Sequence, residues 1–246
     1  MSDSVVVDAD SAVVFYRPAV GEERSLPARD VSPAALLQAA PWRTFHWYFG
    51  QRHYSGMYWS ATERGHVIYE SRLEWANLLL ADFDASVHRI AAPPFSLRAE
   101  VDGQFRRHVP DFLWDTDHGP VVVDVIRAER MMHPKIVLLC TWTKIIVESL
   151  GWSYLVVNEP SVIHSGNVRF LSGCRRDWLI NQDLLSEIRS RRTQFNNRSI
   201  VDIERGFGEH LTPSVRPALM HLLWCHEYRV DMARPLRSST VLEVSE

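Results

Sequence analysis

The sequence predicts an α/β fold followed by a mainly helical region in the last third of the chain. Residues 71–157 give, in order, an apolar helix, three strand-like runs, a second helix and one more strand. After Pro160 the sequence becomes helical and rich in arginine. The order helix, three strands, helix, strand is typical of a sheet covered by helices, because each element must bury its apolar face against a neighbour.

The composition is that of an ordinary folded protein. The chain has 246 residues, of which 46% are apolar and 23% are charged, and this length allows one or two domains. The sequence has no run of eighteen apolar residues, so it predicts no membrane span. Its first residues lack the pattern of a secretory signal. Three scattered cysteines do not form a disulfide framework. We therefore expect a cytoplasmic protein without membrane contact.

Changes in residue composition and patterning along the chain predict three parts. The first alternates small apolar and polar residues, which predicts an edge strand near residues 5–16 and loops that cover the main domain. The second opens with many aromatic residues and a predicted hairpin, 56–60 with 66–69, around a turn at Gly65. The expected boundaries are an N-terminal extension (1–41), a central domain (42–160) and a C-terminal region (161–246).

The elements of the central domain follow from its apolar periodicity. Leucines and aromatic residues cover a wide arc of the first helix, and the second helix begins at Pro134, a favoured residue for a first helical position. Gly151 ends that second helix. The expected elements are a helix at 71–84, strand-like runs at 87–101 (interrupted by Pro93-Pro94), 104–114 and 120–127, a helix at 134–150 and a strand at 152–157.

The C-terminal region is predicted to be all-helical except for a closing hairpin. Helices are expected at 161–180, 183–191, 199–207 and 213–225, with short strands at 228–231 and 239–244. Small helices closed by a short hairpin resemble a winged helix-turn-helix.

The most informative pair of residues is Asp111 and Asp124. Each lies in a strand-like run, and the turn-forming segment 115–120 separates the two runs. A hairpin symmetric about that segment places the two aspartates directly opposite each other, with Cβ atoms about 4.5–5.5 Å apart. The second run is nearly all valine, which is typical of a strand covered on both faces.

Two carboxylates this close repel each other and raise each other's pKa. Burial adds to the free-energy cost of keeping both of them ionised. A hard divalent cation between them would remove that cost, and Mg²⁺ is commonly bound by one or two carboxylates and several waters. The alternative is that Asp111 caps a turn and Asp124 pairs with an arginine. A third carboxylate, Glu74, is expected from the preceding helix. Ser71 and Glu74, however, also have the spacing of a helix-capping box.

At this point the residues resemble a known family, the TnsA-like endonuclease subunit of heteromeric transposases, within the PD-(D/E)xK or restriction-endonuclease-like superfamily. The likeness covers roughly residues 42–160 and continues more loosely through residues 167–171. It depends on the runs Tyr69-Glu70-Ser71-Arg72-Leu73-Glu74, His108-Val109-Pro110-Asp111-Phe112, Val123-Asp124-Val125 and Ala128-Glu129-Arg130. The resemblance implies a restriction-endonuclease-like αβββαβ core in which Glu74, Asp111 and Asp124 bind Mg²⁺ or Mn²⁺ and carry out catalysis.

The sequence departs from the family motif at one position. The family places a lysine two residues after the second acid, and here that position is Ile126. Arg127 cannot replace it, because neighbouring strand residues point to opposite faces. Lys135, in the first turn of the following helix, is the better candidate to reach back to the site; its alternative role is a solvated or phosphate-contacting residue.

Several basic residues are candidates for contacts to DNA, although an ordinary solvated surface explains each of them as well. They are Arg52, His53, Arg106, Arg107 and Arg127.

The resemblance implies a metal-dependent endonuclease subunit that cleaves the 5′ ends of a transposon. Its partners would be the transposon-end DNA, a TnsB-like transposase and a TnsC-like ATPase regulator. Because of Ile126, a catalytically impaired nuclease-fold subunit with a role in assembly is the alternative. A stand-alone repair or restriction nuclease is a third reading, which requires cleavage without partners.

Overall fold

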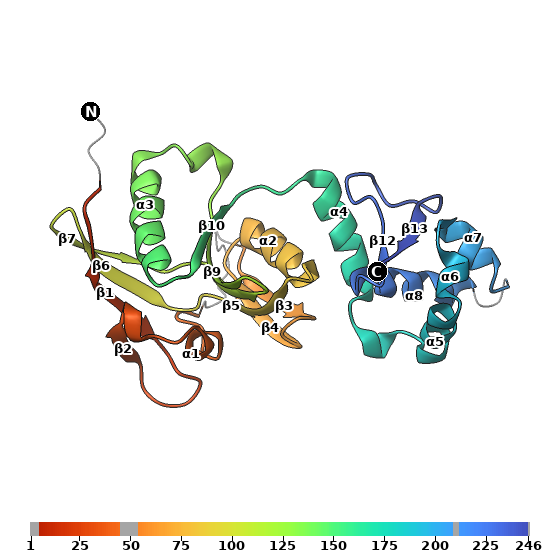
Figure 1. The fold of residues 1–246 in the computed structure, drawn as a ribbon, viewed down its shortest axis with the longest axis horizontal. Coiled ribbons are helices and arrows are strands. Elements are labelled where there is room, and N and C mark those ends of the chain that lie inside the picture. The colour runs from red at the N-terminus through yellow and green to blue at the C-terminus, as the bar shows by residue number, and fades with distance from the viewer. Residues whose placement is uncertain (1–4, 45–53, 209–211, 246) are drawn as a thin grey trace. The chain divides into compact units, whose positions relative to one another are not determined.

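The fold is mixed α/β, in a computed structural model that describes residues 5–44, 54–208 and 212–245 (Figure 1). The chain divides into two compact units, Met1–Glu159 and Pro160–Glu246. The N-terminal 41 residues belong to the first unit, because their strand pairs with a strand of the central region. Within the described residues, no helix has the length and apolar character that crossing a bilayer requires.

A four-stranded sheet in the first unit has the order β10-β9-β8-β5. Its strands are β5 (Val87–Ala91), β8 (Phe112–Thr116), β9 (Gly119–Val125) and β10 (Ser153–Val157). The first three pair antiparallel, whereas β10 runs parallel to β9 after the crossover helix α3 (Pro134–Ser149). Val122 and Val123, on opposite faces of β9, are both fully buried, which confirms that this strand is covered on both sides.

The predicted runs 87–101 and 104–114 are each two strands in different sheets. The expected interruption of the first run at Pro93-Pro94 is confirmed, whereas the prediction of the second as one continuous run was wrong. The first run divides into β5 and β6 (Ser96–Val101), and the second into β7 (Gln104–His108) and β8. The breaks fall at Pro93-Pro94 and Pro110, residues that lack the N–H needed to continue a ladder. The β6–β7 hairpin is thus inserted between β5 and β8.

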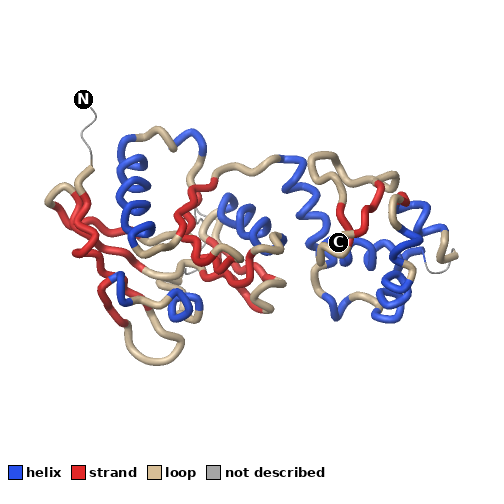
Figure 2. Tube along the Cα trace, viewed as in Figure 1, coloured by secondary structure: helices blue, strands red, loops and turns tan. Residues whose placement is uncertain are grey.

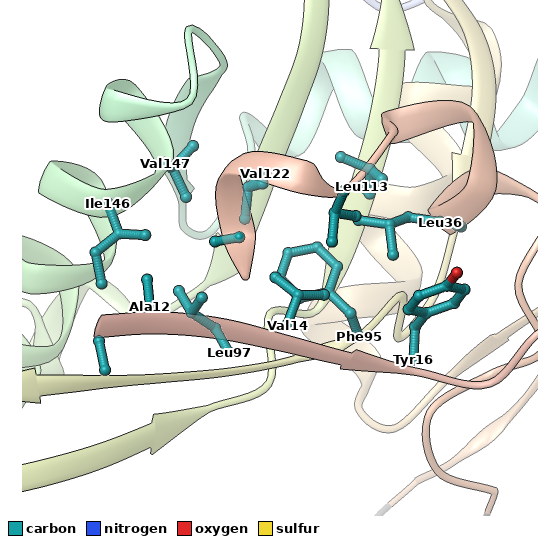
Figure 3. Close-up of a cluster of buried hydrophobic side chains, with 14 of the residues drawn as sticks. Ala12, Val14, Tyr16, Leu36, Phe95, Leu97, Leu113, Val122, Ile146 and Val147 are labelled. Carbon is teal, nitrogen blue, oxygen red and sulfur yellow. The ribbon is translucent and has the colours of Figure 1, made fainter. Parts of the chain in front are cut away.

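The inserted hairpin completes a second sheet of order β2-β1-β6-β7, with β1 (Val7–Tyr16) and β2 (Arg24–Pro27). β1 pairs antiparallel with both β2 and β6, so it is an interior strand and the expectation of an edge strand was wrong. Helix α3 contacts both β10 and β1. Figure 3 shows the resulting core, in which Val14 and Leu97 of the second sheet lie near Val122 and Ile146.

The remaining elements of the first unit are α1 (Pro33–Leu37), the hairpin of β3 (Gly56–Ser60) and β4 (Gly65–Tyr69), and α2 (Arg72–Phe83). The hairpin is anchored to α2 by Asp82, which is buried and accepts hydrogen bonds from the hydroxyls of Tyr58 at 2.7 Å and Ser60 at 2.5 Å. This anchor fixes the helix that carries Glu74.

The second unit combines five helices with a short sheet in its described residues (Figure 2). The predicted closing hairpin is confirmed, because residues 228–229 pair antiparallel with residues 243–244, whereas the strand at 198–199 was not predicted. The predicted helix at 161–180 stops at Leu171 and continues as 3-10 turns. The helices are α4 (Val162–Leu171), α5 (Gln182–Ser190), α6 (Arg192–Phe195), α7 (Ile200–Arg205) and α8 (Thr212–Trp224). The strands β11 (Arg198–Ser199), β12 (Tyr228–Arg229) and β13 (Val241–Val244) form a sheet of order β11-β13-β12.

Candidate functional site

Asp111 and Asp124 lie close together at the open end of the β8–β9 hairpin, where the charge of Asp124 acts on Asp111. The observed ladder ends with Phe112 opposite Val123, and the N–H of Asp111 donates to Val123 O at 3.1 Å, so the hairpin symmetry holds up to the residue before the aspartates. Both aspartates line a cleft of about 860 Å³ in the first unit. The pair is therefore open to a ligand from one side.

Asp111 is held in a position where its ionised form is unfavourable. Its carboxylate Oδ2 accepts one hydrogen bond, from the backbone N–H of Val125 at 2.7 Å. Burial raises the pKa of Asp111 well above its ordinary value, and the negative charges of Glu74 and Asp124 raise it further. The Val125 hydrogen bond and the positive charge of Arg43 only partly oppose this rise. A cation beside Asp111 would favour its charged form.

Asp124 is satisfied by two side-chain donors. It is 2% exposed, its two oxygens each lie 2.8 Å from Nε2 of His108, and Oδ2 accepts the Tyr154 hydroxyl at 2.5 Å. Burial, and then the negative charge of Asp124, raise the pKa of Tyr154 above its ordinary value, so this hydroxyl keeps its proton. His108 and Tyr154 thus fix the direction in which Asp124 points.

Glu74 caps its own helix and also contributes charge to the site. Ser71 Oγ accepts the N–H of Glu74 at 3.1 Å, and Glu74 Oε2 accepts the N–H of Glu70 at 2.7 Å. Burial raises the pKa of Glu74. Ser71 therefore caps the helix as the capping alternative predicts, whereas the Glu74 carboxylate bonds the N–H of Glu70 rather than that of Ser71, and its charge still acts on Asp111. In the part of the chain that the structure describes, no three His, Cys, Asp or Glu side chains form a ready-made ligand cluster.

Ile126, at the position of the family's lysine, lines the same cleft as the two aspartates. It is 9% exposed, and its N–H donates to Val157 O at 2.8 Å. Lys135 is exposed in the first turn of α3, and no lysine is among the described residues that line the cleft. Arg127 is also exposed and lies 4.0 Å from Glu129. The cleft therefore has carboxylates but no ammonium group among these residues.

Arginines supply the positive charge of the cleft instead. Arg17, Arg43, Arg107 and Arg130 line it together with the two aspartates. Of these four, the sequence interpretation identified only Arg107. Arg43 also forms an ion pair with Glu70, with an Nε–Oε1 distance of 2.6 Å.

The other candidate DNA contacts are not among the described residues that line the cleft. Arg106 precedes Arg107 in β7, and its Nε is buried without a hydrogen-bond partner among the described contacts. Arg52 and His53 lie outside the described residues. His108 and Tyr154 are the site residues that sequence reasoning missed. His108 stood within a recognised motif, but nothing local indicates that Tyr154 reaches Asp124 from 30 residues away.

In the second unit, α8 is unsuited to reading bases. From Val215 to Trp224 its residues are buried, apart from Arg216 and the partly buried Pro217. Arg216 is held by Glu204, with Nε–Oε1 and Nη2–Oε2 distances of 2.6 and 2.9 Å.

No protein-family model matches the chain, and no curated protein sequence is significantly similar to it.

Proposed function

We propose that this chain is a divalent-metal-dependent DNA endonuclease with a restriction-endonuclease-like core, acting as a TnsA-like subunit of a transposition complex. The observation that carries the proposal is the pair Asp111 and Asp124, which lie together in a cleft that four arginines also line. Neighbouring carboxylates favour a cation, and arginines favour phosphate. A phosphodiester with a bound metal satisfies both.

The order of elements around the cleft supports the proposed core. With the inserted β6–β7 hairpin set aside, the chain runs α2, β5, β8, β9, α3, β10, and these four strands form one sheet. This is the αβββαβ order expected from the family resemblance. Asp111 lies at the start of the second of these strands, and Asp124 lies in the third.

The donor atoms in the cleft fit Mg²⁺ or Mn²⁺. Both prefer oxygen ligands, and Mg²⁺ needs only one or two protein carboxylates because it keeps several waters. Asp111 and Asp124 would hold the ion, with Glu74 contributing negative charge. When bound, the metal would supply activation of water and stabilisation of charge on the attacked phosphodiester.

The chain's own side chains have separate tasks in this proposal. His108 and Tyr154 orient Asp124, so that one carboxylate is fixed before substrate arrives. The arginines of the cleft bind and orient the phosphodiester backbone. Ile126 and the other apolar residues exclude water from the floor of the cleft.

The second unit supports dependence on partners. Its elements run α5, β11, α7, α8, β12, β13 with the sheet order β11-β13-β12, an arrangement that fits a winged helix. Because α8 is buried, this unit offers little surface for base contacts. Target choice would therefore come from a TnsB-like transposase and a TnsC-like ATPase regulator, while this subunit cleaves the 5′ ends in the cytoplasm.

Ile126 favours a second candidate, a nuclease-fold subunit that serves assembly without cleaving DNA. A missing preorganised charge lowers a rate by roughly 10²–10³. The cleft arginines cannot replace a lysine in proton transfer, because arginine stays charged.

A nicking assay separates the two candidates. The full chain would be incubated with Mn²⁺ or Mg²⁺, its cognate transposase and transposon-end DNA, with Asp111→Ala as the matched variant. Metal-dependent 5′ nicking that Asp111→Ala abolishes supports the endonuclease. Wild-type protein that assembles with the transposase on DNA but leaves the strand intact overturns it in favour of the assembly role. Cleavage without any partner would instead indicate a stand-alone nuclease.

A further inference from the structure

Two arginines from distant parts of the chain converge on one tryptophan in the cleft. The guanidinium carbon of Arg17 lies 5.3 Å from the ring centroid of Trp42, and that of Arg107 lies 5.6 Å from it. Arg17 follows β1, whereas Arg107 is in β7, and all three residues line the cleft. Because both guanidinium groups lie against the same ring, they are no more than about 11 Å apart.

The ring is fixed before any ligand binds. Trp42 is 7% exposed, its backbone N–H donates to Pro93 O at 2.9 Å, and its ring packs against Phe15 with centroids 6.5 Å apart. A buried indole held in this way presents a rigid surface to the cations beside it.

Arg107 is also fixed, and its charge is left available. Its Nε donates to the hydroxyl of Ser96 at 2.7 Å, and Ser96 is fully buried. No carboxylate of the described residues forms an ion pair with Arg107, and Arg17 has only a half-exposed contact to Glu23 at 3.8 Å. An exposed ion pair of that kind contributes little. Two like charges held on one ring therefore remain mostly uncompensated, which favours an anion.

We infer that Arg17, Trp42 and Arg107 form a clamp for the DNA backbone phosphates next to the bond that is cut. This inference depends on the proposed function for its substrate. Asp111 is four positions after Arg107, so their Cα atoms are at most about 14 Å apart. One DNA strand, with closely spaced phosphates, can contact the clamp and the aspartate pair together. An isolated anion would occupy only one of them.

The test is DNA binding rather than cleavage. Binding of the full chain to fluorescently labelled duplex DNA would be measured by anisotropy in EDTA at several salt concentrations. We expect Arg17→Ala and Arg107→Ala each to bind roughly 3- to 10-fold more weakly, and to reduce the slope of log K against log salt by about one. Arg107→Lys should keep the slope, because it keeps the charge, yet bind more weakly than wild type, because it loses the planar stacking.

Arg29→Ala is the matched control. Arg29 is an exposed arginine of the same N-terminal segment, it pairs with Asp10 at 3.1 Å, and it does not line the cleft. If Arg29→Ala loses as much DNA affinity as the clamp variants, the clamp is overturned. The same follows if the slope of log K against log salt is unchanged in the clamp variants. Competition by polyglutamate as effective as that by DNA would overturn it in favour of an acidic protein partner. Melting curves confirm that each variant is folded.

The design separates the two proposals. Wild-type binding that both alanine variants retain overturns the clamp and leaves the endonuclease intact. Absence of salt-dependent DNA binding by the wild type overturns the clamp, whereas the endonuclease is decided separately by the nicking assay with metal and transposase.

Discussion

Asp111 and Asp124 line one cleft at the end of the β8–β9 ladder, yet the protein supports their charges very differently. Asp124 receives His108 Nε2 at 2.8 Å and the Tyr154 hydroxyl at 2.5 Å. Asp111 receives one backbone N–H, and burial together with nearby carboxylates raises its pKa. One aspartate is therefore a satisfied structural anchor, whereas the other is kept under strain that a bound cation would relieve.

The first prediction concerns Asp111→Asn. We expect this change to stabilise the metal-free protein at neutral pH by on the order of 1 kcal/mol, or about 2–4 °C in melting temperature. The asparagine oxygen can still accept the Val125 N–H, while the repulsion from Glu74 and Asp124 disappears. Thermal unfolding in EDTA measures the effect. A destabilised Asp111→Asn would show instead that this carboxylate has a structural role.

The pH dependence of that difference has a definite sign. The folded-state pKa of Asp111 is raised above its unfolded value, so the folded state binds the proton more tightly. The resulting stabilisation is complete below the unfolded value of about 4 and is lost as pH rises through the folded pKa. Asp111→Asn should therefore equal wild type in acid and exceed it increasingly toward neutral pH. A constant difference at all pH values would contradict this account.

The second prediction concerns metal binding, measured without catalysis. A ligand that binds only the folded state stabilises it by about 2.7 kcal/mol at 100 times its Kd. Mn²⁺ should therefore raise the melting temperature of the wild type, and chelation should reverse the rise. Asp111→Asn serves as the control, because it lacks one ligand charge and should respond much less. An identical Mn²⁺ response in both proteins would place the ion elsewhere.

The third prediction concerns Asp124→Ala, which should act in the opposite direction from Asp111→Asn. Removal of this buried carboxylate leaves the Tyr154 hydroxyl and the His108 ring without their acceptor, at a cost of about 2–4 kcal/mol. Urea unfolding measures the loss. Tyr154→Phe is the milder companion, because it removes one hydrogen bond and should cost about 1 kcal/mol. A neutral Asp124→Ala would contradict the anchoring role.

The sequence predicted the local part of this site and missed the long-range part. The turn segment 115–120 and the valine-rich run after it were sufficient to predict the register of β8 and β9, which is confirmed from Thr116 opposite Gly119 to Phe112 opposite Val123. This register brings Asp111 and Asp124 to the same cleft, although the ladder ends before them. The residue pattern that predicts a strand, however, does not indicate which sheet the strand joins. The runs at 87–101 and 104–114 therefore hid the β6–β7 hairpin, although their prolines marked the breaks.

The cleft arginines illustrate the same limit. Arg17 and Arg107 are 90 residues apart and meet on Trp42 only because β1 lies beside β6 and β6 beside β7. Nothing in the local sequence around Arg17 distinguishes it from any other exposed arginine. The β1–β6 pairing is what brings this residue to the cleft, and a single sequence carries no local signal for it.

The fourth prediction concerns Ile126→Lys, which restores the family's lysine. Ile126 lines the cleft two residues after Asp124, and residues two apart in a strand share a face. A lysine there would place an ammonium group beside two carboxylates. Its attraction to them offsets part of the stabilisation that is lost when the buried isoleucine side chain is removed. We expect metal-dependent nicking to rise by about 10²–10³ if the missing charge limits the rate.

The matched control for Ile126→Lys is Ile136→Lys. Ile136 also lines the cleft, but it lies on α3 rather than on the strand that carries Asp124. A general gain of positive charge would raise DNA binding and nicking in both variants, whereas a positioned ammonium group acts only from residue 126. Equal nicking by the two variants would therefore show that charge alone, and not its place on the strand beside Asp124, limits cleavage.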